Sequence, residues 1–221
     1  MKDWAIIFDV DGVLLKLTRA EEELFFQPYA GRIDATILSR NWNSYTIRND
    51  EDIVREIVER YGLPASDAAI IIAEYLALLE QELSGSLKTE TIAGAAKLID
   101  EFVKVAKLGI ATANFREAAR LRLHQADMWE PVSRLAFGAD GGGHKSAILA
   151  RAIAGSGLPT SRIIFIGDNV NDVRAGLDNE VHFIGFSSDA ARRKMLAAAG
   201  AKQVVSHHDE TCAVIRQILN A

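Results

Sequence analysis

The sequence predicts an α/β protein with a doubly wound parallel sheet and an inserted, smaller α-helical domain. Three observations lead to this fold class. Short apolar runs alternate with helical patterns over most of the 221 residues. One long interval, 15–87, contains helical patterns but no convincing strand. The composition, with 49% hydrophobic and 25% charged residues, is that of a globular protein able to bury a full core.

The predicted sheet has six strands, each a short apolar run bounded by turn residues. They are 4–8, 108–112, 134–137, 162–166, 181–186 and, as the weakest, 203–205. Helical patterns lie between and after them, at 91–107, 117–125, 145–154, 172–178, 190–199 and 211–219. Alternation of this kind favours a parallel, Rossmann-like sheet with helices on both faces.

The helical interval follows the first strand. Its patterns cover 18–29, 50–61 and 66–83, with a start signal at Asn49-Asp50, a stop at Gly62-Leu63-Pro64 and a new start at Ser66-Asp67. We therefore predict a core domain made of 1–15 and 88–221, and a helical domain made of 16–87. The inserted domain is expected to cover the core and to help select what binds there.

Charge and apolar content exclude several classes of partner. Thirty acidic against 25 basic residues give a formal net charge of −5, so we expect neither nucleic acid nor a membrane surface as partner. The first apolar run is interrupted at Asp9 before a signal-peptide core is complete, and the longest apolar helical stretch, 68–79, is shorter than the ~20 residues needed to span a bilayer. Cys212 is the only cysteine, which favours a reducing, cytoplasmic setting.

Two aspartates follow the first predicted strand. Asp9 and Asp11 are two positions apart and precede Gly12, at the carboxyl edge of a parallel sheet, where open α/β folds bind ligands. Two like charges at such a place need compensation, and a divalent cation would supply it. The alternative is that Asp11-Gly12 is a simple turn and Asp9 a strand-end cap.

The strand at 162–166 ends in the same way. It leads into Gly167 and Asp168, and Asp172 follows four residues later, so a helix that begins here would bring both carboxylates together. Asp168 or Asn169 could instead be an ordinary helix N-cap. Capping accounts for one acidic residue, but not for four at two strand ends.

Polar residues at two further positions could bind an anion. The strand at 108–112 ends in Thr112 and is followed by Asn114, which together with backbone N–H groups could donate hydrogen bonds to a phosphoryl oxygen, although the same residues also commonly begin helices. Lys145 follows a glycine-rich stretch, 138–144, and opens a predicted helix, where its charge opposes the helix dipole. Nearby carboxylates and an anionic ligand would explain that lysine.

Taken in order, these motifs resemble those of the haloacid dehalogenase-like hydrolase superfamily. The resemblance covers 4–15 and 90 to about 187. The helical insert resembles the cap of the phosphoglycolate phosphatase-like subgroup, and within it Gly31-Arg32-Ile33-Asp34 is similar to a Gly-Arg-Thr-Asp element of some members, with Ile33 as a departure.

The resemblance implies phosphoryl chemistry. Asp9 would be the nucleophile that forms an aspartyl-phosphate, and Asp11 the general acid and later the general base. True dehalogenases lack a carboxylate at the position of Asp11, because release of halide requires no proton.

The resemblance also implies a set of binding residues. Mg²⁺ would be held by Asp9, the backbone carbonyl of Asp11 and Asp168, with Asp172 in support. Thr112, Asn114 and Lys145 would bind the transferred phosphoryl group. Separately from the resemblance, an arginine of the insert, Arg32, Arg40 or Arg48, could reach an anionic part of the substrate, and we assign this contact to Arg32.

The function expected from this resemblance is that of a Mg²⁺-dependent phosphatase acting on a small phosphorylated metabolite. A sugar phosphomutase uses the same groups and is the nearest alternative. A non-catalytic phosphoacceptor of the response-regulator type is a more distant one, because its phosphorylated aspartate lies on the third strand of a much shorter domain. The sequence leaves the choice of phosphate ester open.

Overall fold

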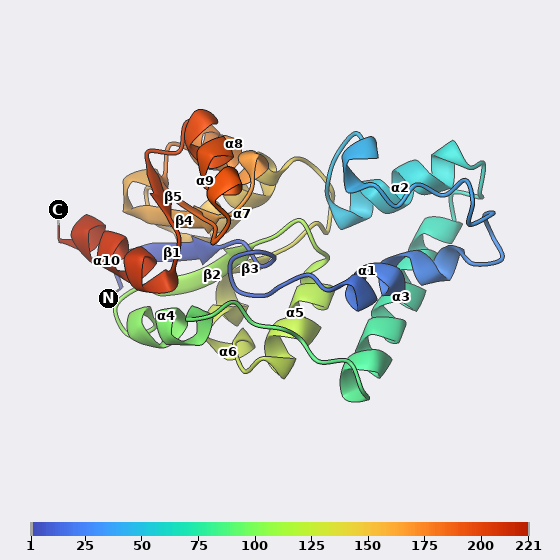
Figure 1. The fold of residues 1–221 in the computed structure, drawn as a ribbon, viewed down its shortest axis with the longest axis horizontal. Helices are drawn as coiled ribbons and strands as arrows, with labels where there is room; N and C mark the ends of the chain where they lie inside the picture. The colour runs from blue at the N-terminus through green and yellow to red at the C-terminus, as the bar shows by residue number, and fades with distance from the viewer. Residues whose placement is uncertain (1, 221) are drawn as a thin grey trace.

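The computed structural model describes residues 2–220 and contains a six-stranded parallel sheet (Figure 1). The strand order is β3-β2-β1-β4-β5-β6, which places β1 in the middle of the sheet. The strands are β1 Ala5–Phe8, β2 Lys107–Ala111, β3 Ala136–Phe137, β4 Ile163–Gly167, β5 His182–Phe186 and β6 Gln203–Val205. The order reverses between β2 and β4 around β1, which creates the switch point at which open α/β sheets bind ligands.

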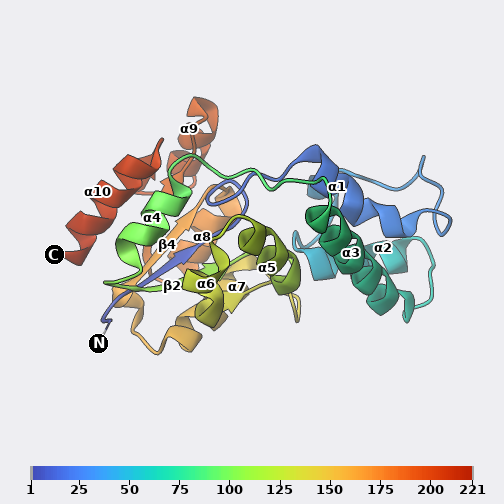
Figure 2. The ribbon, with the colours of Figure 1, turned by 90° about the horizontal axis from the view of Figure 1, so that it is seen from below.

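Helices cover both faces of the sheet. Alternate β1 residues point to opposite sides: Ile6 and Phe8 join one apolar cluster, whereas Ile7 joins the other. On the first side lie α4 Ala95–Phe102, α5 Arg116–Gln125, α6 Trp129–Val132 and α10 His208–Leu219. On the second side lie α7 Lys145–Ser156, α8 Val170–Asp178 and α9 Ala190–Ala198. Figures 1 and 2 show the two helical layers, and the doubly wound fold class is confirmed.

The inserted helices lie beyond the carboxyl ends of the strands (Figures 1 and 2). They are α1 Arg19–Phe26, α2 Asp50–Arg60 and α3 Asp67–Ser84, with short 3₁₀ turns at Gln27–Tyr29 and Trp42–Ser44. Their buried residues form a third apolar cluster, which includes Tyr29, Ile57 and Leu79 and extends to Phe115 of the core. The two connecting segments run side by side, since Lys16 N donates to Glu90 O at 2.8 Å.

Several element boundaries differ from those predicted. The helix expected at 91–107 is reduced to α4. It begins only after Gly94, which adopts a left-handed φ of 87°, and it ends at Phe102 because the chain must turn before β2 begins at Lys107. The strand expected at 134–137 has only two residues, since a 3₁₀ turn at Ser133–Leu135 occupies its first half. Helix α6 was not predicted; its four residues, one of them proline, are too few to show a helical period.

No helix in the described part of the chain is both long enough and apolar enough to cross a bilayer.

Candidate active site

The site is built on the carboxyl end of β1. Asp9 is 8% exposed, its N–H donates to Ile166 O of β4 at 2.8 Å, and its Oδ1 accepts from Val10 N at 2.8 Å. The chain then turns at Gly12, whose φ is 80°. A Cβ at Gly12 would lie 2.2 Å from Asp168 Oδ2, so this turn lies directly against the aspartate of the neighbouring strand end.

The carboxyl end of β4 contributes two more carboxylates. Asp168 follows Gly167, and Asp172 forms a capping box with Asn169 at the start of α8, accepting from Asn169 N at 3.0 Å. Both are buried, with exposed fractions of 7% and 1%. Asp9, Asp168 and Asp172 each place one carboxylate oxygen within 4.8 Å of the others. The structure thus brings together three of the four acids that the sequence singled out.

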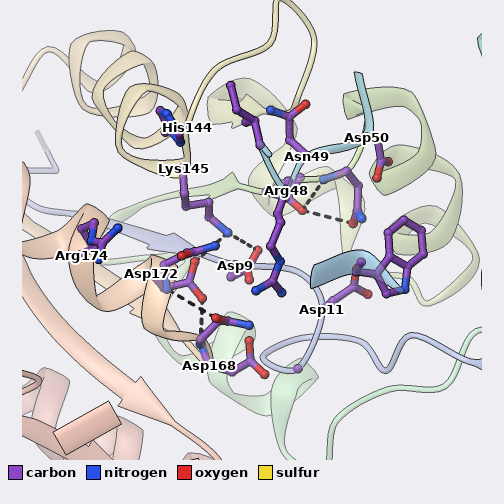
Figure 3. Close-up of a pocket in the computed structure, with 18 of the residues that line it drawn as sticks. Asp9, Asp11, Arg48, Asn49, Asp50, His144, Lys145, Asp168, Asp172 and Arg174 are labelled. Atoms are coloured by element: carbon purple, nitrogen blue, oxygen red, sulfur yellow. Dashed lines mark hydrogen bonds and ion pairs between the residues drawn. The ribbon is translucent and has the colours of Figure 1, made fainter. Parts of the chain in front are cut away.

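Lys145 lies between two of these acids (Figure 3). It is the first residue of α7, its side chain is 8% exposed, and its Nζ lies 2.7 Å from Asp9 Oδ1 and 2.8 Å from Asp172 Oδ1. These contacts explain a lysine at the start of a helix, where the dipole alone would disfavour it.

The carboxylates carry more negative charge than the neighbouring cations offset. Burial raises the pKa of Asp9 well above its usual range; Lys145 opposes this effect, while Asp172 and Asp168 add to it. Burial and Asp172 raise the pKa of Asp168 to about 6, against the opposing influence of Arg192 and Lys145. Burial disfavours the charged form of Lys145, yet Asp172 and Asp9 raise its pKa overall.

The donor set fits a hard divalent cation. Magnesium prefers carboxylate and carbonyl oxygens. Three converging carboxylates face two cations, Lys145 and the Arg192 that pairs with Asp168, which leaves one formal negative charge for the ion to offset. The absence of a side chain at Gly12 keeps the space beside Asp168 open. The acidic cluster could therefore bind such an ion.

Thr112 and Asn114 lie at the carboxyl end of β2 and line the same cavity. Thr112 is 1% exposed, and its Oγ1 donates to Asn114 Oδ1 at 3.1 Å while accepting from Asn114 N at 3.2 Å. The hydroxyl and the amide thus orient each other at the edge of the sheet.

Asp11 also lines the cavity but contacts a different cation. Nη2 of Arg122 lies 2.8 Å from Asp11 Oδ1. The sequence reasoning did not identify Arg122, although an arginine among apolar residues on the buried face of a predicted helix was a visible signal.

The cavity extends from the three carboxylates to the inserted helices and has a volume of about 1090 Å³. The insert contributes Trp42, Arg48, Asn49, Asp50 and Ile53 to its lining. Figure 3 shows the side chain of Arg48 running from the insert toward Asp9. Arg48 makes no ion pair within residues 2–220, so its charge is available to a ligand in the cavity.

Arg32 is not among the residues that line the cavity. Its guanidinium binds Glu74 through two contacts, Nη1 to Oε2 at 2.7 Å and Nη2 to Oε1 at 2.8 Å. The structure therefore does not bring Arg32 to the other predicted site residues, because a carboxylate on α3 holds it within the insert.

The first turn of α2 joins the insert to the core beside the cavity. Asp50 N donates to Ala113 O at 2.9 Å, and Phe115 N donates to Asp50 Oδ2 at 2.8 Å. Asn49 Nδ2 donates to Gly143 O at 2.8 Å. Burial is the main cause that raises the pKa of Asp50 to about 7, with Phe115 N–H opposing it. The sequence marked this position only as a helix start.

The family model for haloacid dehalogenase-like hydrolases matches residues 5–178. The chain belongs to this family. The match spans the first strand, the insert, Lys145 and both carboxylates after β4, so the family predicted from the motifs is confirmed and the protein is a hydrolase. No curated protein matches the sequence.

Solved structures of the same fold include several members of this hydrolase family. A predicted phosphatase from Clostridium acetobutylicum has 18% identity and a TM-score of 0.72, with 98% of this chain and 100% of that chain covered. A putative beta-phosphoglucomutase from Bacteroides vulgatus has 15% identity and a TM-score of 0.71, with coverages of 98% and 89%. A putative phosphoglycolate phosphatase from Lactobacillus plantarum has 16% identity and a TM-score of 0.61, with coverages of 99% and 100%. At these identities the likeness concerns the fold.

Proposed function

We propose that this hydrolase is a Mg²⁺-dependent phosphatase that acts on small phosphate monoesters through an aspartyl-phosphate. The observation that carries the proposal is the placement of Asp9: a carboxylate at the end of the central strand, in contact with Lys145, facing a cavity and flanked by two further carboxylates. A carboxylate nucleophile beside a cation and a candidate metal site suits phosphoryl transfer through a covalent intermediate.

In the proposed first step, a carboxylate oxygen of Asp9 forms a bond to phosphorus as the bond from phosphorus to the ester oxygen breaks. Asp11 gives its proton to the departing oxygen, so that an alcohol leaves. In the second step Asp11 takes a proton from water as that water attacks phosphorus, which regenerates the Asp9 carboxylate and releases inorganic phosphate. Both aspartates line the same cavity, which supports this division of roles.

Binding of the transferred group is assigned to the other strand ends. Lys145, Thr112 and Asn114 would contact the phosphoryl oxygens, and Asp9, Asp168 and Asp172 with the carbonyl of Asp11 would hold Mg²⁺. When bound, the ion would offset the charge that keeps a phosphate dianion away from a carboxylate. Arg48 replaces Arg32 in the proposed substrate contacts, since it is Arg48 that lines the cavity.

The setting proposed for this activity is the cytoplasm, with a small phosphorylated metabolite as the substrate. A single buried cysteine, Cys212, and the net charge of −5 support a reducing compartment and a partner other than nucleic acid or membrane.

Release of inorganic phosphate from phenyl phosphate, with and without Mg²⁺, tests the proposal. We expect Mg²⁺-dependent turnover in the wild-type protein and at least a ~10³-fold loss in Asp9→Asn, which removes the nucleophile. Full activity in Asp9→Asn, or activity indifferent to chelator, would contradict it. Transfer of phosphate between two positions of one sugar would indicate a mutase instead, and a phosphoprotein that persists for minutes would indicate a phosphoacceptor.

A further inference from the structure

A buried arginine connects Asp11 to the base of the inserted helices. Arg122 lies on α5 of the core, and its side chain is 3% exposed. Its Nη2 lies 2.8 Å from Asp11 Oδ1, its Nε donates to Glu21 Oε1 at 2.6 Å, and Nη2 also donates to Lys16 O at 3.0 Å. One guanidinium thus joins the loop after β1, the segment that enters the insert, and α1.

The contacts on the insert side fix the orientation of this guanidinium. Glu21 is 2% exposed, and its second oxygen, Oε2, accepts from Thr18 N at 2.8 Å and from Thr18 Oγ1 at 2.7 Å. Both oxygens of Glu21 are therefore engaged. Because the guanidinium is planar and its donors are rigidly spaced, anchoring at Glu21 also sets where Nη2 lies.

The contact with Arg122 gives the two carboxylate oxygens of Asp11 different surroundings. Asp11 Oδ1 is buried and accepts no hydrogen bond of good geometry within residues 2–220. The ion pair with Arg122 is therefore the contact that offsets the cost of burying this oxygen. The side chain as a whole is nevertheless 25% exposed and lines the cavity. With Oδ1 against Arg122, Oδ2 is the oxygen that a ligand in the cavity can reach.

We propose that Arg122 is a positioning residue that holds Asp11 in the orientation required for proton transfer. The inference rests on the proposed phosphatase function. As the bond from Asp9 to phosphorus forms and the ester bond breaks, the proton on Asp11 Oδ2 passes to the departing oxygen. The resulting carboxylate keeps its contact with the guanidinium at Oδ1, so the orientation persists for the second step.

A purely structural cross-link between core and insert would have a different signature. A general acid matters when the leaving group is a poor one, and hardly matters when the leaving oxygen is stable as an anion. Phenyl phosphate and 2,4-dinitrophenyl phosphate form a suitable pair. Both carry a phenyl ring on the ester oxygen, but the departing oxygen of phenyl phosphate needs a proton much more than that of the dinitrophenyl ester. The kcat/KM of each reports the steps up to release of the phenol, before water enters.

The test compares kcat/KM on the two esters for wild type, Arg122→Gln and Asp11→Asn. For Arg122→Gln we expect a loss of ~10- to 100-fold on phenyl phosphate and of less than ~3-fold on 2,4-dinitrophenyl phosphate, in the pattern of Asp11→Asn. The matched control is Arg120→Gln. Arg120 lies on the same helix and pairs with Glu117 on its outer side at 2.6 Å, so neither kcat/KM should change.

Equal losses on the two esters, or no loss on either, would overturn the inference. If Arg122→Gln does not fold, Arg122→Lys provides the same comparison, because an ammonium group cannot reproduce the fork that contacts Asp11 and Glu21 together. Failure of the phosphatase proposal would appear instead in the wild-type protein, which would release phenol from neither ester.

Discussion

At the scale of single residues, charge balance decides what this cavity can bind. Three carboxylates lie within 4.8 Å of one another, Lys145 contacts two of them, and Arg192 pairs with the third, Asp168. The excess negative charge would repel a phosphate dianion, whereas a divalent cation together with Lys145 would offset it. Without a metal ion these carboxylates would therefore disfavour an anion. Once they hold a divalent cation, that cation and Lys145 would favour it.

Asp50 gives a prediction about pH and stability. Its pKa in the folded protein is raised from 3.8 to about 7, chiefly by burial. The folded state therefore binds more protons than the unfolded state between these values, and this residue's contribution to stability is lost as the pH rises from about 4 through about 7. At pH 8 the buried carboxylate is charged, which costs on the order of 4 kcal/mol.

The substitution Asp50→Asn should remove this dependence, because the amide oxygen can still accept from Phe115 N and never acquires the charge. Thermal unfolding at pH 5 and pH 8 measures it. We expect the variant to gain stability relative to wild type as the pH increases; Asp9 and Asp168 titrate in both proteins, so the difference isolates Asp50. A difference between the two proteins that does not change with pH would refute the assignment.

The candidate site residues that lie at strand ends were predicted from the sequence, and they line one cavity. Asp9, Thr112 and Asp168 each follow an apolar run, and a parallel sheet gathers such ends at one edge. Arg122 escaped this reasoning, and Arg48 could not be told apart from Arg32 and Arg40, because the positions of these side chains depend on how α5 and the insert pack. The sequence also placed Arg32 at the substrate, because a local pattern cannot show that it pairs with Glu74, 42 residues further along the chain.

At the scale of elements, the loop after β1 connects the central strand with the carboxyl end of β4. Gly12 turns in the left-handed region and leaves no room for a side chain beside Asp168. Gly31 has nearly the same φ, 79° against 80°, but its missing Cβ would meet nothing within 4 Å. The chain therefore contains a natural pair that separates backbone strain from steric displacement.

We predict that Gly12→Ala and Gly31→Ala both lose ~1–2 kcal/mol of stability from left-handed backbone strain. Only Gly12→Ala should displace Asp168 and raise the Mg²⁺ concentration needed for half-maximal phosphate release, by ~10-fold or more. Thermal unfolding and Mg²⁺ titration of activity measure the two effects. Equal Mg²⁺ requirements in the two variants would show that Asp168 tolerates the methyl group.

The pattern of elements was predictable because strands here are buried on both faces. Such strands appear as continuous apolar runs, and all six were located from these runs. Helix limits were less certain, since they depend on capping: α8 begins two residues before the predicted start because Asn169 and Asp172 form a capping box. The contacts of the first turn of α2 with the core are tertiary and left no local signal.

At the scale of the whole molecule, the cluster of carboxylates links metal binding to folding. Asp9 directly follows the first strand, whereas Asp168 and Asp172 lie more than 150 positions later in the chain. The cluster therefore exists only when the sheet is assembled. An ion that binds the folded chain alone stabilises it by ~2.7 kcal/mol at 100 times its dissociation constant. For a protein of this size, 1 kcal/mol corresponds to ~2–4 °C in Tm.

Saturating Mg²⁺ should therefore raise Tm by ~5–10 °C over the value in chelator. The substitution Asp168→Asn should abolish most of that rise, because it removes one carboxylate of the cluster. Asp178→Asn is the matched control: Asp178 lies on α8 at the edge of the cavity, binds Ser146 and is not part of the cluster, so its variant should keep the rise. Loss of the rise in both variants, or in neither, would place the cation elsewhere. Since this measurement requires no substrate, it tests the metal site independently of the phosphatase proposal.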